Sequence, residues 1–170
     1  MDDFAERLVE EIPHLRRYAR SLTCDAERGD DLVQDCLHRA WSRMHLWQQD
    51  GNTRAWLFTI MHNIFVNDIR KAQRLAPTEP LELRQHATVG QSDGDRAMLM
   101  RDLEQALAQL RADHREVLIL VGVEQMSYQE VADLLDIPLG TVMSRLHRAR
   151  SKMRDWMNGE QPRVTLRPVT

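Results

Sequence analysis

The stretch SYQEVADLLDIPLGTVMSRLHRAR, residues 127–150, decides the fold prediction because it contains two short helical patterns separated by a break. Ser127 followed by Glu130 is the capping-box pattern that starts a helix. Asp136 tolerates left-handed backbone angles, and Pro138 cannot continue a hydrogen-bonded helix interior, so the first helix is predicted to end between them. Two short helices across such a break, with the small Ala132 where they cross, predict a helix-turn-helix.

The second of these helices is predicted to begin at Gly140 and Thr141, and its exposed face is basic and free of acids. Apolar residues at helical spacing, Val142, Leu146 and Ala149, are expected to face inward. Arginine can donate two hydrogen bonds to guanine, and phosphates favour a face without carboxylates. We therefore predict DNA binding here. The alternative is a helical hairpin whose arginines are merely solvated, since the helix dipole also favours cations near a C-terminus. The candidate DNA-binding residues are Gly140, Thr141, Met143, Ser144, Arg145, His147 and Arg148.

Helical periodicity also organises the rest of the chain. It runs through residues 1–75 and returns over residues 96–158, whereas APTEPLELRQHATVGQSDGD, residues 76–95, has no helical period. Two prolines and two glycines in that interval are typical of a linker. Residues 159–170 read as a tail. The fold class predicted is therefore all-α, with two small helical domains joined by a flexible linker.

Within the first domain, apolar spacing predicts helices over about residues 2–21, 30–44 and 54–74. Pro13 is expected to kink or break the first helix, Gly29 to interrupt the pattern, and Asp30 to cap the second helix. In the second domain, one amphipathic helix is predicted to contain Leu99, Leu103, Ala106, Leu107 and Leu110. HREVLILVGVEQ, from residue 114, could be a strand by periodicity alone. We predict a helix, because a single strand would have no pairing partner.

The composition excludes several classes of protein. The net charge is −3 over 170 residues, so a non-specific basic binder of nucleic acid is not expected. No apolar run approaches the roughly 20 residues that cross a membrane, and the acidic N-terminus does not resemble a secretory signal. The two cysteines are expected to be reduced thiols in a cytoplasmic protein. Because no metal-binding spacing, phosphate loop or nucleophile elbow occurs, we expect no cofactor, no metal, no catalytic residue and no enzymatic activity.

Three segments in this order resemble the extracytoplasmic-function (ECF) class of bacterial RNA polymerase sigma factors. DDLVQDCLHRAW, residues 30–41, resembles the family's helix that binds core polymerase. RAWLFTIMHNIFVNDIRKAQR, residues 54–74, resembles the helix that melts and reads the −10 promoter element. Residues 127–150 resemble the helix-turn-helix that reads the −35 element. The resemblance covers roughly residues 4–157.

This resemblance implies roles for particular residues and a set of partners. Core polymerase (its β′ and β subunits), promoter DNA and a membrane-tethered anti-sigma factor are the partners it implies. Asn63 falls where the family reads a flipped-out base of the −10 element, which needs an amide beside a pocket. Trp56 is expected in the core rather than against a base. The polymerase-binding residues implied are Asp31, Leu32, Gln34 and Asp35, and the −10-binding residues are Arg54, Asn63, Arg70, Lys71 and Arg74.

The sequence departs from the family pattern at two places, and one alternative function remains. The third helix of the first domain ends in a thinner basic run than is usual, and Met143 stands where a Lys or Arg is common. The alternative is a helix-turn-helix regulator that acts without polymerase. Such regulators bind DNA as dimers, and the sequence contains no heptad zipper or spare apolar helix for dimerisation.

Overall fold

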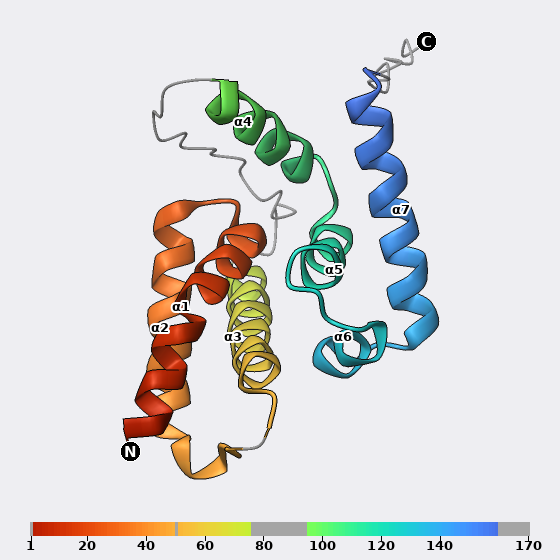
Figure 1. The fold of residues 1–170 in the computed structure, drawn as a ribbon. Coiled ribbons are helices and arrows are strands. Elements are labelled where there is room, and N and C mark those ends of the chain that lie inside the picture. Colours follow the sequence, from red (N-terminus) through yellow and green to blue (C-terminus); the bar gives the residue numbers. More distant parts are fainter. Residues whose placement is uncertain (1, 50, 76–94, 160–170) are drawn as a thin grey trace.

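The computed structural model describes residues 2–49, 51–75 and 95–159, and all its regular elements in these ranges are helical. The helices are α1 (Asp2–Thr23), α2 (Ala26–Ser42), the short 3₁₀ helix η1 (Met44–Leu46), α3 (Thr53–Leu75), α4 (Asp95–Ala108), α5 (Ala112–Gly122), α6 (Tyr128–Leu135) and α7 (Leu139–Met157). The all-α prediction with a first and a second helical domain is confirmed (Figure 1). The predicted linker lies almost wholly outside the described residues. None of the described helices is long and apolar enough to cross a membrane.

The first domain is a three-helix bundle in which α1 packs on both α2 and α3. Its centre contains the fully buried side chains of Leu15, Tyr18, Cys36 and Phe58. Of the two outcomes expected at Pro13, a kink or a break, the break does not occur, because α1 runs continuously from Asp2 to Thr23.

The connection between α1 and α2 differs from its prediction. Asp25, not Asp30, caps α2, and its carboxylate accepts a hydrogen bond from the backbone N–H of Arg28 at 2.9 Å. Gly29 therefore lies inside the helix rather than at a break. A Cβ there would lie 3.1 Å from Cγ and 3.3 Å from the backbone N of Arg20, so the glycine lets α1 and α2 approach closely.

We expect Gly29→Val to destabilise the chain by roughly 1–3 kcal/mol, because the backbone of α1 cannot yield to the added side chain. Urea unfolding followed by circular dichroism measures this cost. Gly122→Val is the matched control, since the nearest atom to a Cβ there is Leu118 Cδ1 at 3.9 Å. Equal unfolding midpoints for the two variants would contradict the close-approach explanation.

A cluster of aromatic rings holds the loop between α2 and α3. The ring of Phe4 lies 5.9 Å from Trp41, 5.1 Å from Trp47 and 6.2 Å from Trp56, centroid to centroid. Trp47 also donates from Nε1 to the hydroxyl of Thr53 at 3.0 Å, at the first residue of α3. Trp56 packs against the core, as expected. The cluster therefore fixes where α3 begins.

In the second domain, α5 is a helix as predicted, and the helix-turn-helix forms from α6 and α7. Both halves of the capping box are present between Ser127 and Glu130. Asp136 ends α6 with left-handed angles (φ 51°, ψ 50°), and α7 starts directly after Pro138. The predicted amphipathic helix forms as α4, which ends before Leu110; Ala106 and Leu110 are buried, whereas Leu103 is 42% exposed.

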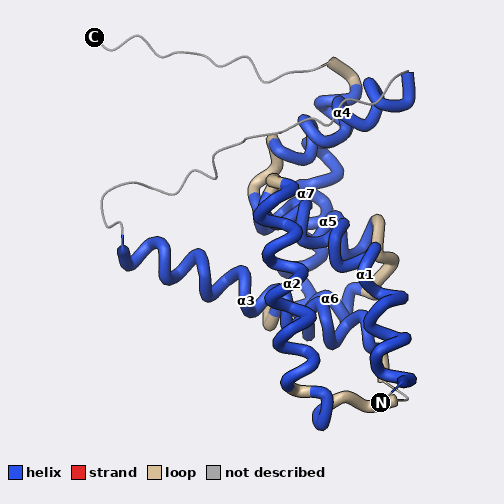
Figure 2. The backbone as a smooth tube through the Cα atoms, turned by 90° about the vertical axis from the view of Figure 1, so that its left-hand side faces the viewer, coloured by secondary structure: helices blue, strands red, loops and turns tan. Residues whose placement is uncertain are grey.

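The two domains pack against each other, which the sequence pattern did not predict. Helix α5 lies on α1, and α6 lies on α3 (Figures 1 and 2). The buried apolar residues of both domains belong to one contiguous cluster. Helix α2 packs on α1 and α3 and lies on the side of the first domain away from α6 and α7.

Candidate nucleic-acid and polymerase interface

The exposed face of α7 contains most of the predicted DNA-binding residues. Val142, Leu146 and Ala149 point into the domain, as predicted, with exposures of 0–2%. On the opposite side, Ser144, His147 and Arg148 are exposed and Met143 is 49% exposed. This face contains no carboxylate before Asp155. It can therefore approach the phosphates and base edges of a duplex.

The N-terminus of α7 is open at Gly140 and Thr141. No side chain caps this helix end, and Pro138 at the N-cap has no N–H group of its own. A Cβ at Gly140 would meet nothing within 4 Å, so packing inside the protein does not require glycine there. Backbone N–H groups at a helix N-terminus favour anions, and a glycine lets a phosphate come close to them.

Arg145 occupies a different position from the one predicted. Its Nε lies 3.5 Å from a carboxylate oxygen of Asp113, and its side chain is only 26% exposed. Asp113, in the first turn of α5, also accepts a hydrogen bond from Nε of Arg111 at 3.2 Å. An acid of the same domain thus neutralises Arg145. Arg148, by contrast, makes no hydrogen bond or ion pair with any residue that the structure describes.

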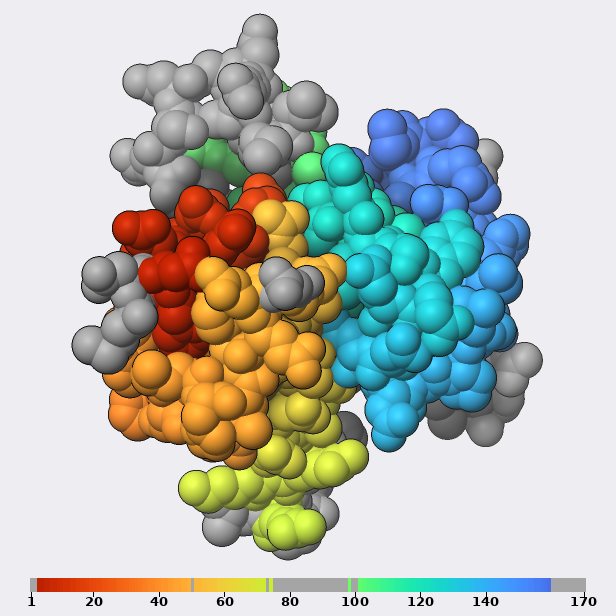
Figure 3. Space-filling model, turned by 60° about the horizontal axis from the view of Figure 1, so that its bottom comes forward, coloured from red at the N-terminus to blue at the C-terminus, as the bar shows by residue number. Residues whose placement is uncertain are grey.

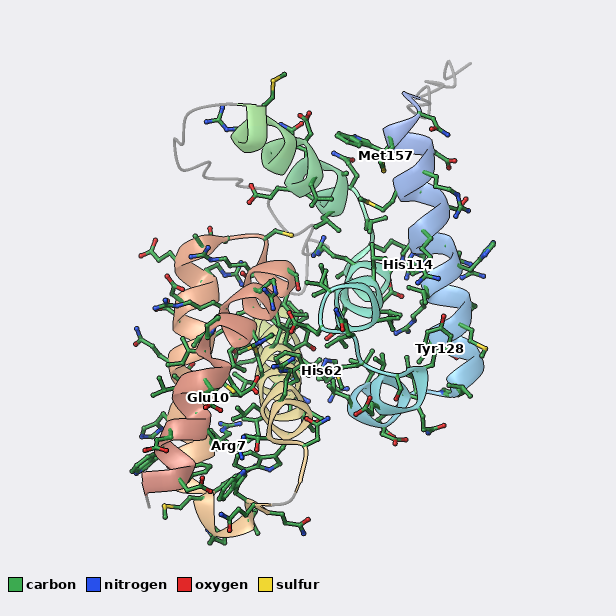
Figure 4. The ribbon with its side chains drawn as sticks, viewed as in Figure 1. Arg7, Glu10, His62, His114, Tyr128 and Met157 are labelled. Carbon is green, nitrogen blue, oxygen red and sulfur yellow. The ribbon has the colours of Figure 1, made fainter. Side chains whose placement is uncertain are left out.

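His114 lies buried beneath this face, between α5 and α7 (Figure 4). Burial lowers the pKa of its imidazole. Asp113 opposes that effect, and Arg111, Arg148 and Arg145 add to it. The ring nitrogen Nδ1 has no hydrogen-bond partner among the described residues. The folded domain therefore favours a neutral His114.

We expect the stability of the chain to fall as the pH drops below about 6.5, the ordinary pKa of histidine. The sign follows from linkage. The pKa of His114 is lower in the folded chain than in the unfolded chain, so the unfolded chain binds more protons as the pH falls, and acid favours unfolding. Thermal unfolding between pH 7.5 and 5.5 measures the slope. His114→Gln should flatten it, whereas His147→Gln, at an exposed position of the same domain, should not. Equal slopes for both variants would exclude His114 as the cause.

The predicted −10-binding residues lie along α3. Asn63 is exposed, as are Arg70, Lys71 and Arg74. Figure 3 shows that the last turns of α3 project beyond the body of the molecule. A projecting helix end with three cations can contact a DNA backbone without interference from the rest of the protein.

Arg54 is not available in this arrangement for the phosphate role predicted for it. Its Nε donates to Glu11 at 2.6 Å, and its Nη2 donates to Nε2 of His14 at 2.9 Å. The side chain is 32% exposed. Sequence reasoning missed this because Glu11 and His14 come from another helix.

The outer side of α2 presents an acidic face, formed by Asp31, Gln34 and Asp35, all of them exposed. We call it the acidic docking face after the role predicted for these residues. Leu32 must be removed from the predicted polymerase-binding set, because it is 5% exposed and packs in the bundle core. A groove continues from this face toward α3. It is lined by Asp35, His38, Arg39, Ser42, Arg43, Ile64 and Asp68. His38 and Arg39 were not predicted, although their spacing of three and four residues from Asp35 would have indicated them.

The cysteines take no part in these surfaces. Both thiols are free, and Cys36 is buried in the first domain, where burial raises the pKa of its thiol to about 12. Cys24 is half-buried, and burial also raises the pKa of its thiol. Within the described ranges, no group of three His, Cys, Asp or Glu side chains is arranged to hold a metal ion.

Two family models match the chain, one in each domain. Residues 8–62 match the family described as the Sigma2 domain of PhyR, and residues 100–153 match Sigma-70, region 4. The ECF RNA polymerase sigma factor EcfG of Rhodopseudomonas palustris is 39% identical over 153 residues, which cover 89% of this chain and 83% of that protein.

Two solved structures are similar over nearly the whole chain. The sigma factor RpoE in complex with the anti-sigma factor NepR, from Bartonella quintana, is 32% identical with a TM-score of 0.80 and covers 95% of this chain and 100% of that one. CnrH in complex with the cytosolic domain of CnrY is 27% identical with a TM-score of 0.66, covering 93% of this chain and 89% of that one.

Proposed function

The chain belongs to the extracytoplasmic-function family of RNA polymerase sigma factors, and we propose from this that it binds core RNA polymerase and directs it to a narrow set of promoters. The observation that supports this best is the 39% identity to an ECF sigma factor, which extends over 89% of the chain and so includes both domains. A DNA-binding regulator that acts without polymerase would leave the acidic docking face of the first domain without a role. The proposed role is not enzymatic.

In this proposal each exposed surface has one partner. The acidic docking face on α2 binds the β′ subunit of core polymerase. Asn63 reads a base of the −10 element while the cations at the end of α3 hold its backbone. The outer face of α7 reads the −35 element in the major groove. Each domain alone would bind weakly, and joining them on one chain raises the effective concentration of the second contact.

Gel filtration of the chain with core polymerase tests this function. We expect the two to elute together and the complex to retain labelled promoter DNA that core polymerase alone releases. If the chain binds the DNA but elutes apart from core polymerase, it acts as a regulator without polymerase docking.

We also propose that an anti-sigma factor regulates the chain. Two of the structures similar to it are sigma factors bound to anti-sigma partners, NepR and CnrY. A TM-score of 0.80 over 95% of this chain requires both domains to superpose together on the NepR-bound RpoE. The arrangement of domains described here is therefore one that an anti-sigma factor can hold. We further propose that the partner covers both the docking face and the DNA-binding helix and is tethered to the membrane, whereas the chain itself acts in the cytoplasm.

A further inference from the structure

The two domains meet along an interface that combines apolar packing with buried polar contacts, and the proposed function does not use the polar contacts. On the first-domain side it is formed by α1, α3 and the residues just before α3. On the second-domain side it is formed by α5, the turn after it and α6. Figure 4 shows His62 on the side of α3 that faces these helices. Two carboxylates of the second domain, Glu116 and Glu124, are the centres of the interface.

Glu124 is fully buried against basic side chains of the first domain. Arg17 donates from Nε to one of its oxygens at 2.6 Å, and His14 donates from Nδ1 to the other at 2.7 Å. Because Arg54 donates to Nε2 of His14, we assign the hydrogen of that ring to Nδ1. The 2.8 Å approach of Arg17 to the same Nδ1 is then not a hydrogen bond. Glu11 pairs with Arg54, so the network holds two acids and two arginines.

Glu116 forms the second centre. Its Oε1 accepts hydrogen bonds from the hydroxyl of Tyr18 at 2.6 Å and from Nδ1 of His62 at 2.7 Å. The neighbouring Arg115 is 3% exposed and donates from Nε to the backbone oxygen of Ser21 at 2.6 Å. That oxygen belongs to the last turn of α1, where carbonyl groups lack helical partners and attract a cation.

These contacts stabilise the pairing of the domains rather than either domain alone. A buried carboxylate without its partners is strongly unfavourable, which makes the interface specific while it is closed. When the domains separate, water can solvate the same carboxylates, arginines and histidines, so neither domain has to unfold. An interface that mixes polar with apolar contacts in this way can open and close reversibly.

The closed pairing does not fit simultaneous binding of both promoter elements. Positions −10 and −35 lie about 25 base pairs apart, which is about 85 Å along B-form DNA. In the structure α3 and α7 both pack on α6. Helices in contact have axes about 8–10 Å apart, so α3 and α7 come within about 20 Å of each other across α6. Both elements can be read only after the domains separate.

We propose that Glu116 and Glu124, with their first-domain partners Tyr18, His62, His14 and Arg17, form an interdomain latch that holds the free chain in a closed state unable to engage a promoter with both domains. The closed state needs no partner protein. The acidic docking face on α2 lies away from the latch and stays accessible, so polymerase docking can precede opening. The part of the proposal that concerns promoters rests on the proposed function; the latch itself does not.

Small-angle X-ray scattering of the full chain tests the latch without using its activity. The double variant Glu116→Gln and Glu124→Gln keeps the shape of both side chains and removes their charge. We expect its radius of gyration to exceed that of the wild type by about 5 Å or more, from the size of two separated 80-residue domains. Arg17→Gln, at a side chain that is 47% exposed, should shift the radius in the same direction with little effect on either core.

Glu104→Gln with Asp133→Asn is the matched control, because it removes two exposed carboxylates from the same domain. It should scatter like the wild type, and circular dichroism should report equal helix content for all four proteins. An extended wild type, or compact forms of both the latch variant and Arg17→Gln, would overturn the latch.

Promoter binding by the polymerase complex then links the latch to function. If 1–10% of the wild type is open, the latch variant should bind a promoter with both elements about 10- to 100-fold more tightly, but an isolated −35 duplex with little change. Equal gains on both DNAs would overturn the proposed role of the latch in promoter engagement. If no protein of the set binds core polymerase, the proposed function fails while the scattering result still decides the latch.

Discussion

Reversing Asp31 and Asp35 to Lys is expected to abolish binding to core polymerase while leaving helix content unchanged. The two side chains lie four residues apart on one exposed face of α2, and neither makes a hydrogen bond or ion pair within the described ranges. Their replacement therefore removes no contact that holds the bundle together. Loss of a buried charge pair at an interface costs about 2–5 kcal/mol, so two reversals should weaken binding by 100-fold or more.

Reversal of Glu6 and Glu10 to Lys is the matched control for the docking face. These residues are also exposed and four apart, but they lie on α1, and the change in net charge is the same. Binding to immobilised core polymerase should remain within a few-fold of wild type. If both double variants lose binding equally, general electrostatic attraction rather than a docking face on α2 explains the interaction.

Arg148→Ala is expected to weaken binding to the correct −35 duplex by about 1–3 kcal/mol and to relax the preference at one base pair. Arg148 is exposed on the acid-free face of α7 and is not neutralised by an ion pair within the described residues. Arg145→Ala should have a smaller effect that is uniform across sequences, because Asp113 already holds Arg145 inside the domain.

Fluorescence anisotropy on matched and singly mismatched duplexes, at several salt concentrations, separates these effects. Arg154→Ala is the control, since it removes the same charge from an exposed position in the last turn of α7. A uniform loss of affinity for Arg148→Ala, with the base preference intact, would assign Arg148 to a phosphate rather than to a base.

Local chemistry made the helix-turn-helix predictable. A capping box, a residue with left-handed angles and a proline each act through contacts within a few residues of the chain. All three lie where the sequence indicated. The inward-facing positions of α7 followed from spacing alone. The family resemblance, supported by three segments in order, correctly identified the family of the chain.

Contacts between distant segments made other predictions wrong. Gly29 looks like a helix break in the sequence, but it permits the close packing of α2 on α1. Sequence reasoning predicts DNA contacts for both Arg54 and Arg145. In the fold each pairs with an acid on another helix, whose position the local sequence pattern does not indicate. Leu32 was included in the docking set by the family resemblance, although its own spacing placed it on the buried face.

The interface between the domains was missed for the same reason. Nothing in the sequence next to Glu116 and Glu124 distinguishes them from solvent-exposed acids. Their partners lie about 50 to 110 residues away along the chain. Two acids that end up buried would be a signal only if the helices beside them were known. The net charge of each domain is near zero. A count of charges by domain therefore does not reveal that acids of one domain pair with bases of the other.

In vitro transcription by core polymerase, with and without the chain, tests the central claim most directly. The template is a library of genomic promoter fragments, and the 5′ ends of the transcripts are mapped. We predict that the chain induces initiation from a small subset sharing one −35 and one −10 sequence, and that the Asp31→Lys and Asp35→Lys double variant induces none. The same transcripts with and without the chain, or initiation unaffected by that double variant, would contradict the account.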